Sequence, residues 1–260
     1  MAGAATARPG LSVSGEGHTI DIASDVDLSA GIDIAGRGNT LVIGPGVSLS
    51  TAPGGRHPAL RIVGEGQHIR LGAGGRLSLQ ASVEGTGARL ELGERVIATA
   101  FINLLGTHTD LTVGAGTTMV QAAIQLHEPG HIRIGRDCMI SSQVYISLSD
   151  IHPIYDLATG ERINPAASVE IGDHVWLGLR SMVMKGSRIG DGSVVAAGAL
   201  VSGEVEPACI VGGTPARVLR RGVVWRRDFD EAPPEPVILP AAATSRLDGL
   251  LARLWRRARR

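Results

Sequence analysis

His152 is the side chain of this sequence best suited to accept a proton. It lies in the segment Ser149-Asp-Ile-His-Pro-Ile-Tyr-Asp156, and a free imidazole, with an ordinary pKa of about 6.5, exchanges protons near neutral pH. Such a base can remove the proton of a hydroxyl group, otherwise a poor nucleophile, as the hydroxyl attacks an electrophile, and it contributes ~10² to 10⁴-fold in rate. Asp150 can orient the imidazole or bond to the backbone of a local turn. The spacing leaves both roles open.

Repeats must position this segment. A pattern of aliphatic, any, aliphatic, small residue recurs along the chain, and its second aliphatic residue falls at Ile22, Ile43, Leu71, Leu92, Val113, Ile134 and Ile171. Four of the six intervals are 21 residues; the interval of 28 contains the Pro/Gly-rich stretch 51–58, and the interval of 37 contains His152. A fixed period of this size is the mark of a solenoid. Because long loops on rigid scaffolds usually carry function, the insertion at His152 is the place to expect it.

Within each period the inward positions recur every six residues. Counting 6 and 12 residues beyond the second aliphatic residue gives further apolar residues in most coils, and from Ile171 the six-residue register continues without a break to Val201. The coil that contains Met119 is weaker, because Gln125 follows at the next position. One inward residue in six is too sparse for a helix or for ordinary strand alternation. We therefore expect three-sided coils of short strands, with glycines at corners that need positive φ, stacked as parallel sheets.

The register also predicts the limits of each part of the chain. Residues 1–10 are expected to be a flexible N-terminus, 11–224 a β-helix with an active-site loop at 147–168, and 225–240 a Pro-rich linker. Residues 241–260 have leucines at helical spacing among arginines and read as a basic amphipathic helix. Such a tail can lie on an anionic membrane, dock on a partner or remain a solvated end.

Composition narrows the classes of protein. Hydrophobic residues make up 43% and aromatic residues only 3%, so Ile, Leu, Val and Ala must fill the core. The formal net charge is +0, which argues against nucleic acid as a partner. Cys138 and Cys209 are too few for a disulfide framework. Neither a signal peptide nor an apolar run long enough for a membrane span is recognisable, so we expect a soluble, cytoplasmic protein.

Three segments together resemble a known family: the His152 loop, Ile171-Gly-Asp-His-Val-Trp-Leu-Gly178 and Ile210-Val-Gly-Gly-Thr-Pro-Ala-Arg217. They are similar to the hexapeptide-repeat acyltransferases, closest to the bacterial capsular polysaccharide and polysialic acid O-acetyltransferases. The resemblance implies an all-β, left-handed parallel β-helix, a homotrimer, and transfer of an acetyl group from acetyl-CoA to a hydroxyl of a bacterial surface polysaccharide or its sugar precursor.

The resemblance also implies roles for individual residues. His152 is the expected general base, and Trp176, 24 residues later, an expected active-site residue. Trp176 precedes an inward leucine and should face outward, where it can reach the reaction or contact a subunit. Because the two residues fall at different corners of the coil, we expect a site shared across the trimer interface. The remaining expected residues are Tyr155 and Asp156 toward the acceptor, and Leu179, Ala197, Ser202 and Arg217 toward acetyl-CoA.

The sequence departs from the family at one position, and several alternative functions remain open. Gly203 stands where the family has a lysine that helps to hold the donor. The same residues would serve an amino-sugar N-acyltransferase, and a non-catalytic β-helix scaffold is a further alternative. His127, His131 and His152 suggest a zinc-dependent β-helix carbonic anhydrase, but that ligand spacing is not reproduced, and no metal is expected. The long N-terminal stack is either a platform for a polymer or a structural extension.

Overall fold

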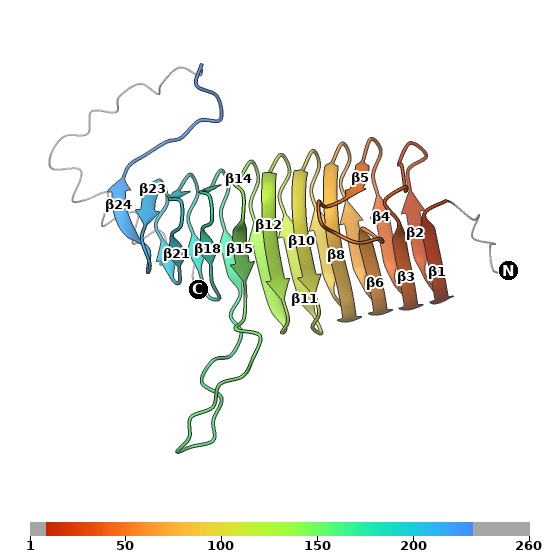
Figure 1. The fold of residues 1–260 in the computed structure, drawn as a ribbon, viewed down its shortest axis with the longest axis horizontal. Helices are drawn as coiled ribbons and strands as arrows, with labels where there is room; N and C mark the ends of the chain where they lie inside the picture. Colours follow the sequence, from red (N-terminus) through yellow and green to blue (C-terminus); the bar gives the residue numbers. More distant parts are fainter. Residues whose placement is uncertain (1–8, 231–260) are drawn as a thin grey trace, which may run out of the picture. The chain divides into compact units, whose positions relative to one another are not determined.

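A computed structural model describes residues 9–230 of the chain. By its contacts the chain divides into two units, Met1–Trp225 and Arg226–Arg260. Across residues 9–230 all regular secondary structure is β-strand, and the strands form two sheets (Figure 1). Three predicted segments lie wholly or mostly outside the described residues: the flexible N-terminus at 1–10, the linker at 225–240 and the tail at 241–260. No helix long and apolar enough to cross a membrane occurs in the described part of the chain.

The smaller sheet has nine strands and forms one face of the coils. Its strands are β2 (Thr19–Ile22), β4 (Thr40–Ile43), β7 (His68–Leu71), β9 (Arg89–Leu92), β11 (Thr109–Val113), β13 (Gly130–Ile134), β16 (Val169–Ile171), β19 (Arg188–Ile189) and β22 (Glu204–Val205). All neighbours in it are parallel, and Ile22, Ile43, Leu71, Leu92, Val113, Ile134 and Ile171 stand in one continuous register. The period counted in the sequence is therefore the true repeat of the fold.

The larger sheet has fifteen strands and forms the other two faces. Its strands are β1 (Leu11–Glu16), β3 (Ile32–Arg37), β5 (Ser48–Thr51), β6 (Leu60–Glu65), β8 (Arg76–Thr86), β10 (Ile97–Leu104), β12 (Thr118–Leu126), β14 (Met139–Ile140), β15 (Val144–Ser147), β17 (Trp176–Leu177), β18 (Met182–Val183), β20 (Val194–Val195), β21 (Leu200–Val201), β23 (Cys209–Gly212) and β24 (Arg217–Arg221). Among these strands of the described residues, only β23 and β24 pair antiparallel. The architecture is the left-handed parallel β-helix expected from the sequence.

Aliphatic ladders fill the interior. Leu177 pairs with Val195 and Val183 with Val201, as the six-residue register predicts, and all four side chains are buried. Each coil has one short strand per face and cannot bury these residues by itself, so stability comes from the neighbouring coil, stacked at the ~4.8 Å spacing of hydrogen-bonded strands.

A bulge corrects the expected register in the coil of Met119. Strand β12 carries an extra residue opposite β10, after which Ile102 pairs with Ile124 and Leu104 with Leu126. Ile124 and Leu126 are buried, so the inward positions are apolar, and the prediction that Gln125 is inward was wrong by one residue. A one-residue insertion exchanges the two sides of a strand, and periodic counting cannot detect where it falls.

The glycine corners have a steric cause. Gly36 has φ +113° and pairs with Gly15 on one side and Gly64 on the other. A Cβ added at Gly36 would lie 2.1 Å from the carbonyl oxygen of Gly64. Neither the backbone angle nor the space between these coils admits a side chain.

Candidate active site

A long arm, residues 149–166, leaves the end of β15 and returns at β16 (Figure 1). Its base is closed by the Ala167 N–H, which donates to the Leu148 carbonyl at 2.9 Å. Farther out its two sides pair antiparallel: the Ile163 N–H donates to Ile154 O and the Asp156 N–H to Glu161 O, both at 2.9 Å. The insertion is thus an ordered hairpin that projects from one edge of the β-helix.

The tip of the arm is shaped by Asp156. Its carboxylate accepts the backbone N–H groups of Ala158 at 2.8 Å and Thr159 at 2.9 Å. These bonds, with that of Thr159 the larger, hold the pKa of Asp156 below its usual value. Asp156 therefore closes the tip turn, whereas its neighbour Tyr155, 56% exposed, presents its ring to the surroundings.

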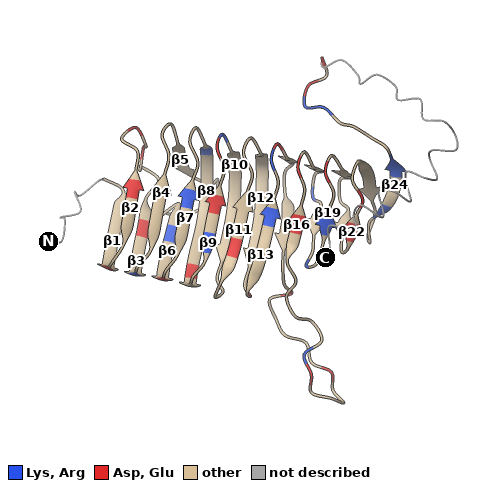
Figure 2. Ribbon diagram, turned by 180° about the vertical axis from the view of Figure 1, so that it is seen from behind, with Lys and Arg blue, Asp and Glu red and all other residues tan. Residues whose placement is uncertain are grey.

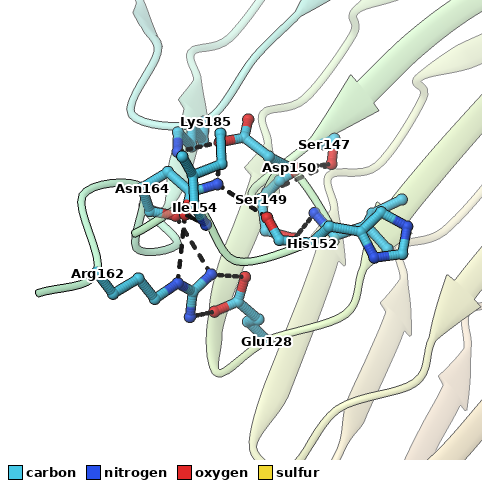
Figure 3. Close-up of polar contacts among 10 residues, drawn as sticks. Glu128, Ser147, Ser149, Asp150, His152, Ile154, Arg162, Asn164 and Lys185 are labelled. Carbon is cyan, nitrogen blue, oxygen red and sulfur yellow. Dashed lines mark hydrogen bonds and ion pairs between the residues drawn. The ribbon is translucent and has the colours of Figure 1, made fainter. Parts of the chain in front are cut away.

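His152 stands next to a tight turn at the root of the arm. Its N–H donates to the Asp150 carbonyl at 2.7 Å, two residues back, and the residue between them, Ile151, has φ +68°. This is a γ-turn with positive φ, a rare and strained conformation, all the more for a β-branched residue. The imidazole is exposed, and Figure 3 shows it pointing away from the cluster formed by Lys185, Asp150 and Asn164.

Asp150 has a role that the sequence did not suggest. Its carboxylate accepts the Lys185 ammonium at 2.5 Å and the Asn164 side-chain amide at 2.9 Å. The bond from Lys185, followed by that from Asn164, lowers the pKa of Asp150. The sequence left two roles open for Asp150, to orient the imidazole or to cap a turn. The contacts of its carboxylate match neither role. It instead ties the arm to Lys185, which follows strand β18 of the next coil.

Asn164 is the centre of this cluster and was missed by the sequence analysis (Figure 3). Its Nδ2 donates to the Asp150 carboxylate and to the His152 carbonyl, both at 2.9 Å, and its Oδ1 accepts the Ile154 N–H at 2.6 Å. The residue is buried although it belongs to a projecting loop. An asparagine before a proline is usually read as a turn signal, so no motif marked it in advance.

A second attachment holds the arm to the preceding coil. The Arg162 guanidinium donates to both carboxylate oxygens of Glu128, at 2.6 and 2.8 Å, and Glu128 lies between β12 and β13. The hydrogen bond from Arg162 is the main cause that lowers the pKa of Glu128. Bidentate pairs of this geometry are the strong class of charge-assisted hydrogen bond. The arm is therefore fixed to the coils before and after it.

Trp176 faces outward on β17, as expected, and is 37% exposed. Its ring lies 6.0 Å from that of Trp225, which stacks on His174 with the ring centroids 3.9 Å apart. The Trp225 indole also donates to the His174 carbonyl at 2.8 Å. His174 thus holds the segment that supports Trp176; its ring also bonds to Asp137 at 2.7 Å.

One chain does not bring His152 and Trp176 to the same corner. The arm lies between β15 and β16, whereas Trp176 begins β17, so the face formed by β16 separates the two residues. In Figure 1 the arm leaves one edge of the solenoid and β14, the neighbour of β17, starts near the opposite edge.

The residues expected to bind acetyl-CoA fall on more than one edge. Leu179 and Ala197 are exposed at successive turns of one edge, where the Gly198 N–H donates to the Leu179 carbonyl at 2.8 Å. Ser202 follows β21, which stacks below β15 and β18, and so lies on the edge of the arm. Arg217 is exposed on β24. Gly203, with φ +157°, has no atom within 4 Å of the position of a Cβ.

The histidines considered as metal ligands have other partners. His127 bonds to Gln125 at 3.0 Å, and burial lowers its pKa. His131 bonds to Glu170 at 2.5 Å and to Ser168 at 3.2 Å. Residues 9–230 contain no cluster of three or more His, Cys, Asp or Glu side chains suited to a metal ion.

In its C-terminal coils the left-handed β-helix matches the hexapeptide repeats of a transferase family. Residues 168–203 match the family model described as "Bacterial transferase hexapeptide (six repeats)". By its repeats, its fold and its relatives, the chain is similar to the hexapeptide-repeat transferases.

Two relatives are polysialic acid O-acetyltransferases. The one from Neisseria meningitidis is 33% identical over 141 residues, covering 54% of this chain and 66% of the relative. The one from Escherichia coli O1:K1 / APEC is 36% identical over 124 residues, covering 48% of this chain but 38% of the relative. The match thus spans only part of each relative's length.

Solved structures extend the likeness to nearly the whole chain. The polySia specific acetyltransferase NeuO has a TM-score of 0.54 at 25% identity, covering 94% of this chain and 100% of that one. The polysialic acid O-acetyltransferase OatWY also has a TM-score of 0.54, at 26% identity, covering 92% and 98%. The N-terminal coils therefore have counterparts in these folds.

Proposed function

We propose that this protein transfers an acetyl group from acetyl-CoA to a hydroxyl of a bacterial surface polysaccharide or of its sugar precursor. The observation that carries the proposal is the position of His152, exposed at the root of an ordered arm on a β-helix similar to polysialic acid O-acetyltransferases. A base in this position meets the requirement of O-acyl transfer, because a sugar hydroxyl must lose its proton as it attacks.

The reaction needs one proton acceptor and one proton donor. The imidazole of His152 accepts the hydroxyl proton while the hydroxyl oxygen attacks the thioester carbonyl. The tetrahedral intermediate collapses by breaking the carbon–sulfur bond, and the imidazolium returns the proton to the departing thiolate. The acetyl ester and free coenzyme A are the products, and the enzyme regains its starting state. Trp176 contributes an indole N–H donor beside the reacting groups.

A homotrimer with shared active sites accounts for the separation of His152 and Trp176. The arm carries five exposed apolar side chains: Ile151, Ile154, Tyr155, Leu157 and Ile163. The outer rows of the larger sheet in the C-terminal coils are also apolar: Met139, Trp176 and Val194 in one register, and Tyr145, Met182 and Leu200 in another. Apolar surface of this extent favours a subunit contact, in which the arm of one subunit faces Trp176 of the next.

The smaller sheet has the opposite character and fits a solvated face. Figure 2 shows charged residues of both signs along its strands, and Arg133, Glu170, Arg188 and Glu204 stand in one register. Opposite charges on neighbouring strands attract each other, and their alternation leaves no continuous positive track along this face. An anionic polymer, if it is the acceptor, must therefore be recognised elsewhere, at the edges that carry the arm.

Leu179 and Ala197 mark the edge proposed for the donor. Successive exposed turns with backbone N–H and C=O groups suit the amide groups of pantetheine, and Arg217 supplies a cation for the phosphates. Gly203 cannot replace the charge of the family lysine, so Arg217 carries more of that task here. Because acetyl-CoA is a cytoplasmic metabolite, this donor also favours a cytoplasmic location.

Thiol release from acetyl-CoA tests the proposal. The full chain is incubated with acetyl-CoA and a panel of neutral, sialylated and amino-sugar glycans, and the product is identified as ester or amide. We expect ester formation that falls ~10² to 10⁴-fold in His152→Ala. Turnover with amino sugars alone would favour the N-acyltransferase alternative, and no turnover with any acceptor would favour a scaffold.

Mixed trimers test the shared site. Subunits with His152→Ala and subunits with Trp176→Ala are each expected to be weak, and trimers reassembled from both should recover part of the activity. A shared site restores an intact pair at some interfaces, whereas a site within one chain restores none.

A further inference from the structure

The strained turn before His152 needs something to hold it. Ile151 keeps φ +68° while exposed, so its own side-chain packing does little to enforce this conformation. Backbone strain of this kind persists only where the surroundings over-determine it, and it gathers at functional sites. The contacts on either side of Ile151 should therefore show what fixes the orientation of His152.

Asn164 contacts both sides of that turn. One Nδ2 hydrogen meets the Asp150 carboxylate and the other the His152 carbonyl, each at 2.9 Å. A side-chain amide has two N–H donors, and both are used here. Its oxygen accepts the Ile154 N–H at 2.6 Å, which places the chain just beyond His152. Asn164 is 7% exposed, so these bonds compete little with water.

The cluster is anchored outside the arm as well. Lys185, on the following coil, holds the Asp150 carboxylate at 2.5 Å, so a line of contacts runs from the rigid coil through Asp150 and Asn164 to the His152 carbonyl (Figure 3). The first two contacts attach the arm to the coil. The last one alone bears on His152 itself.

We propose that Asn164 is a positioning residue that orients the His152 imidazole by fixing its backbone carbonyl across the strained turn. The inference rests on the proposed function only for the role of the imidazole as base. It assigns to Asn164 a task separate from holding the arm, and that separation can be tested.

An exchange of two side chains separates the tasks. Asn164→Asp keeps the acceptor for Ile154 but loses both donors and places a carboxylate beside that of Asp150. Adding Asp150→Asn restores one amide-to-carboxylate contact and a single negative charge between positions 150 and 164. The exchanged pair can attach the arm, but it cannot donate to the His152 carbonyl.

Two measurements are made on the single and the double variant. Hydrogen exchange of the arm amides reports its attachment, and thiol release with the best acceptor of the panel reports turnover. We expect Asn164→Asp to lower both, with kcat down ~10²-fold and KM for acetyl-CoA unchanged. The double variant should recover the protection of the arm but keep kcat at least ~10-fold below wild type. Recovery of kcat together with protection would overturn the proposal.

A matched control is Asn103→Asp, the same chemical change at a residue that bonds to Gln125 on an outer face. We expect it to leave kcat unchanged.

The imidazole itself is observed by NMR, which needs no turnover. The His152 Cε1–H resonance is assigned by its loss in His152→Gln, and we expect it to shift or broaden in both Asn164 variants. An unchanged resonance would overturn the proposal whether or not the arm regains its protection. If wild type shows no transfer at all, the proposed function fails while this readout still decides the role of Asn164.

Discussion

Removing the Glu128 charge should loosen the arm without unfolding the β-helix. In Glu128→Gln, Arg162 loses its bidentate partner, which it contacts at 2.6 and 2.8 Å with both side chains less than one third exposed. The variant loses a charge-assisted bidentate contact at the point where the arm meets the preceding coil. The amides of the arm should therefore exchange ~10-fold faster.

Hydrogen exchange followed by mass spectrometry on peptides covering 154–164 makes this measurement. The coils should keep their protection, because their aliphatic ladders do not depend on the arm. A matched control is Glu84→Gln, which removes an exposed ion pair with Arg61 of the kind that contributes ~0 to 1 kcal/mol. Unchanged exchange in the arm of Glu128→Gln would refute the idea that this pair attaches it.

The remaining predictions concern the turn, the corners, Trp176 and pH. Ile151→Gly should raise the melting temperature slightly but lower kcat. Glycine relieves ~1 to 2 kcal/mol of strain at positive φ, which exceeds the ~0.5 to 1 kcal/mol that its greater unfolded-state entropy costs. A fall in both the melting temperature and kcat would contradict the strain. Gly36→Ala should destabilise the coils by ~2 to 5 kcal/mol, combining that strain with overpacking, and denaturant unfolding that matches wild type would speak against this corner. Trp225→Ala removes a buried ring and should destabilise the segment that packs on His174 by up to ~3 to 5 kcal/mol, and it should lower kcat because Trp176 loses its neighbour; normal turnover would exclude that support. The pKa values of Glu128 and Asp150 are lowered by their cationic partners from the ordinary values of 4.5 and 3.8. These contacts therefore stabilise the arm at pH above the ordinary pKa values, and the stabilisation is lost as pH falls through the folded-state pKa values. Hydrogen exchange of the arm that does not accelerate below about pH 4 would argue against this linkage.

Sequence periodicity predicted the scaffold because every coil repeats the same requirement. One inward aliphatic residue in six is needed wherever a coil stacks on the next, so Ile22 and Ile171 can be aligned by counting alone. The count failed at the bulge of β12, where one additional residue moved the inward position from Gln125 to Leu126, the partner of Leu104. Counting at a fixed period cannot locate a single inserted residue.

The arm shows the limit of this reasoning. The insertion and the histidine in it stood out against the repeat, and the spacing to Trp176 placed the two at different corners. Nothing in the order of residues 149–166 shows that Asn164 reaches back to the His152 carbonyl, or that Arg162 reaches Glu128, 34 residues earlier. These contacts depend on how the hairpin folds against two coils.

The sequence by itself therefore determined the β-helix, its register and the residue that acts as the candidate base, because these follow from local spacing repeated along the chain. Tertiary structure alone decided which groups hold that base. Asp150 proved to be the partner of Lys185 and Asn164, and Trp176 the neighbour of Trp225. Such pairs join residues far apart in the chain through side-chain geometry, on which residue order places almost no constraint.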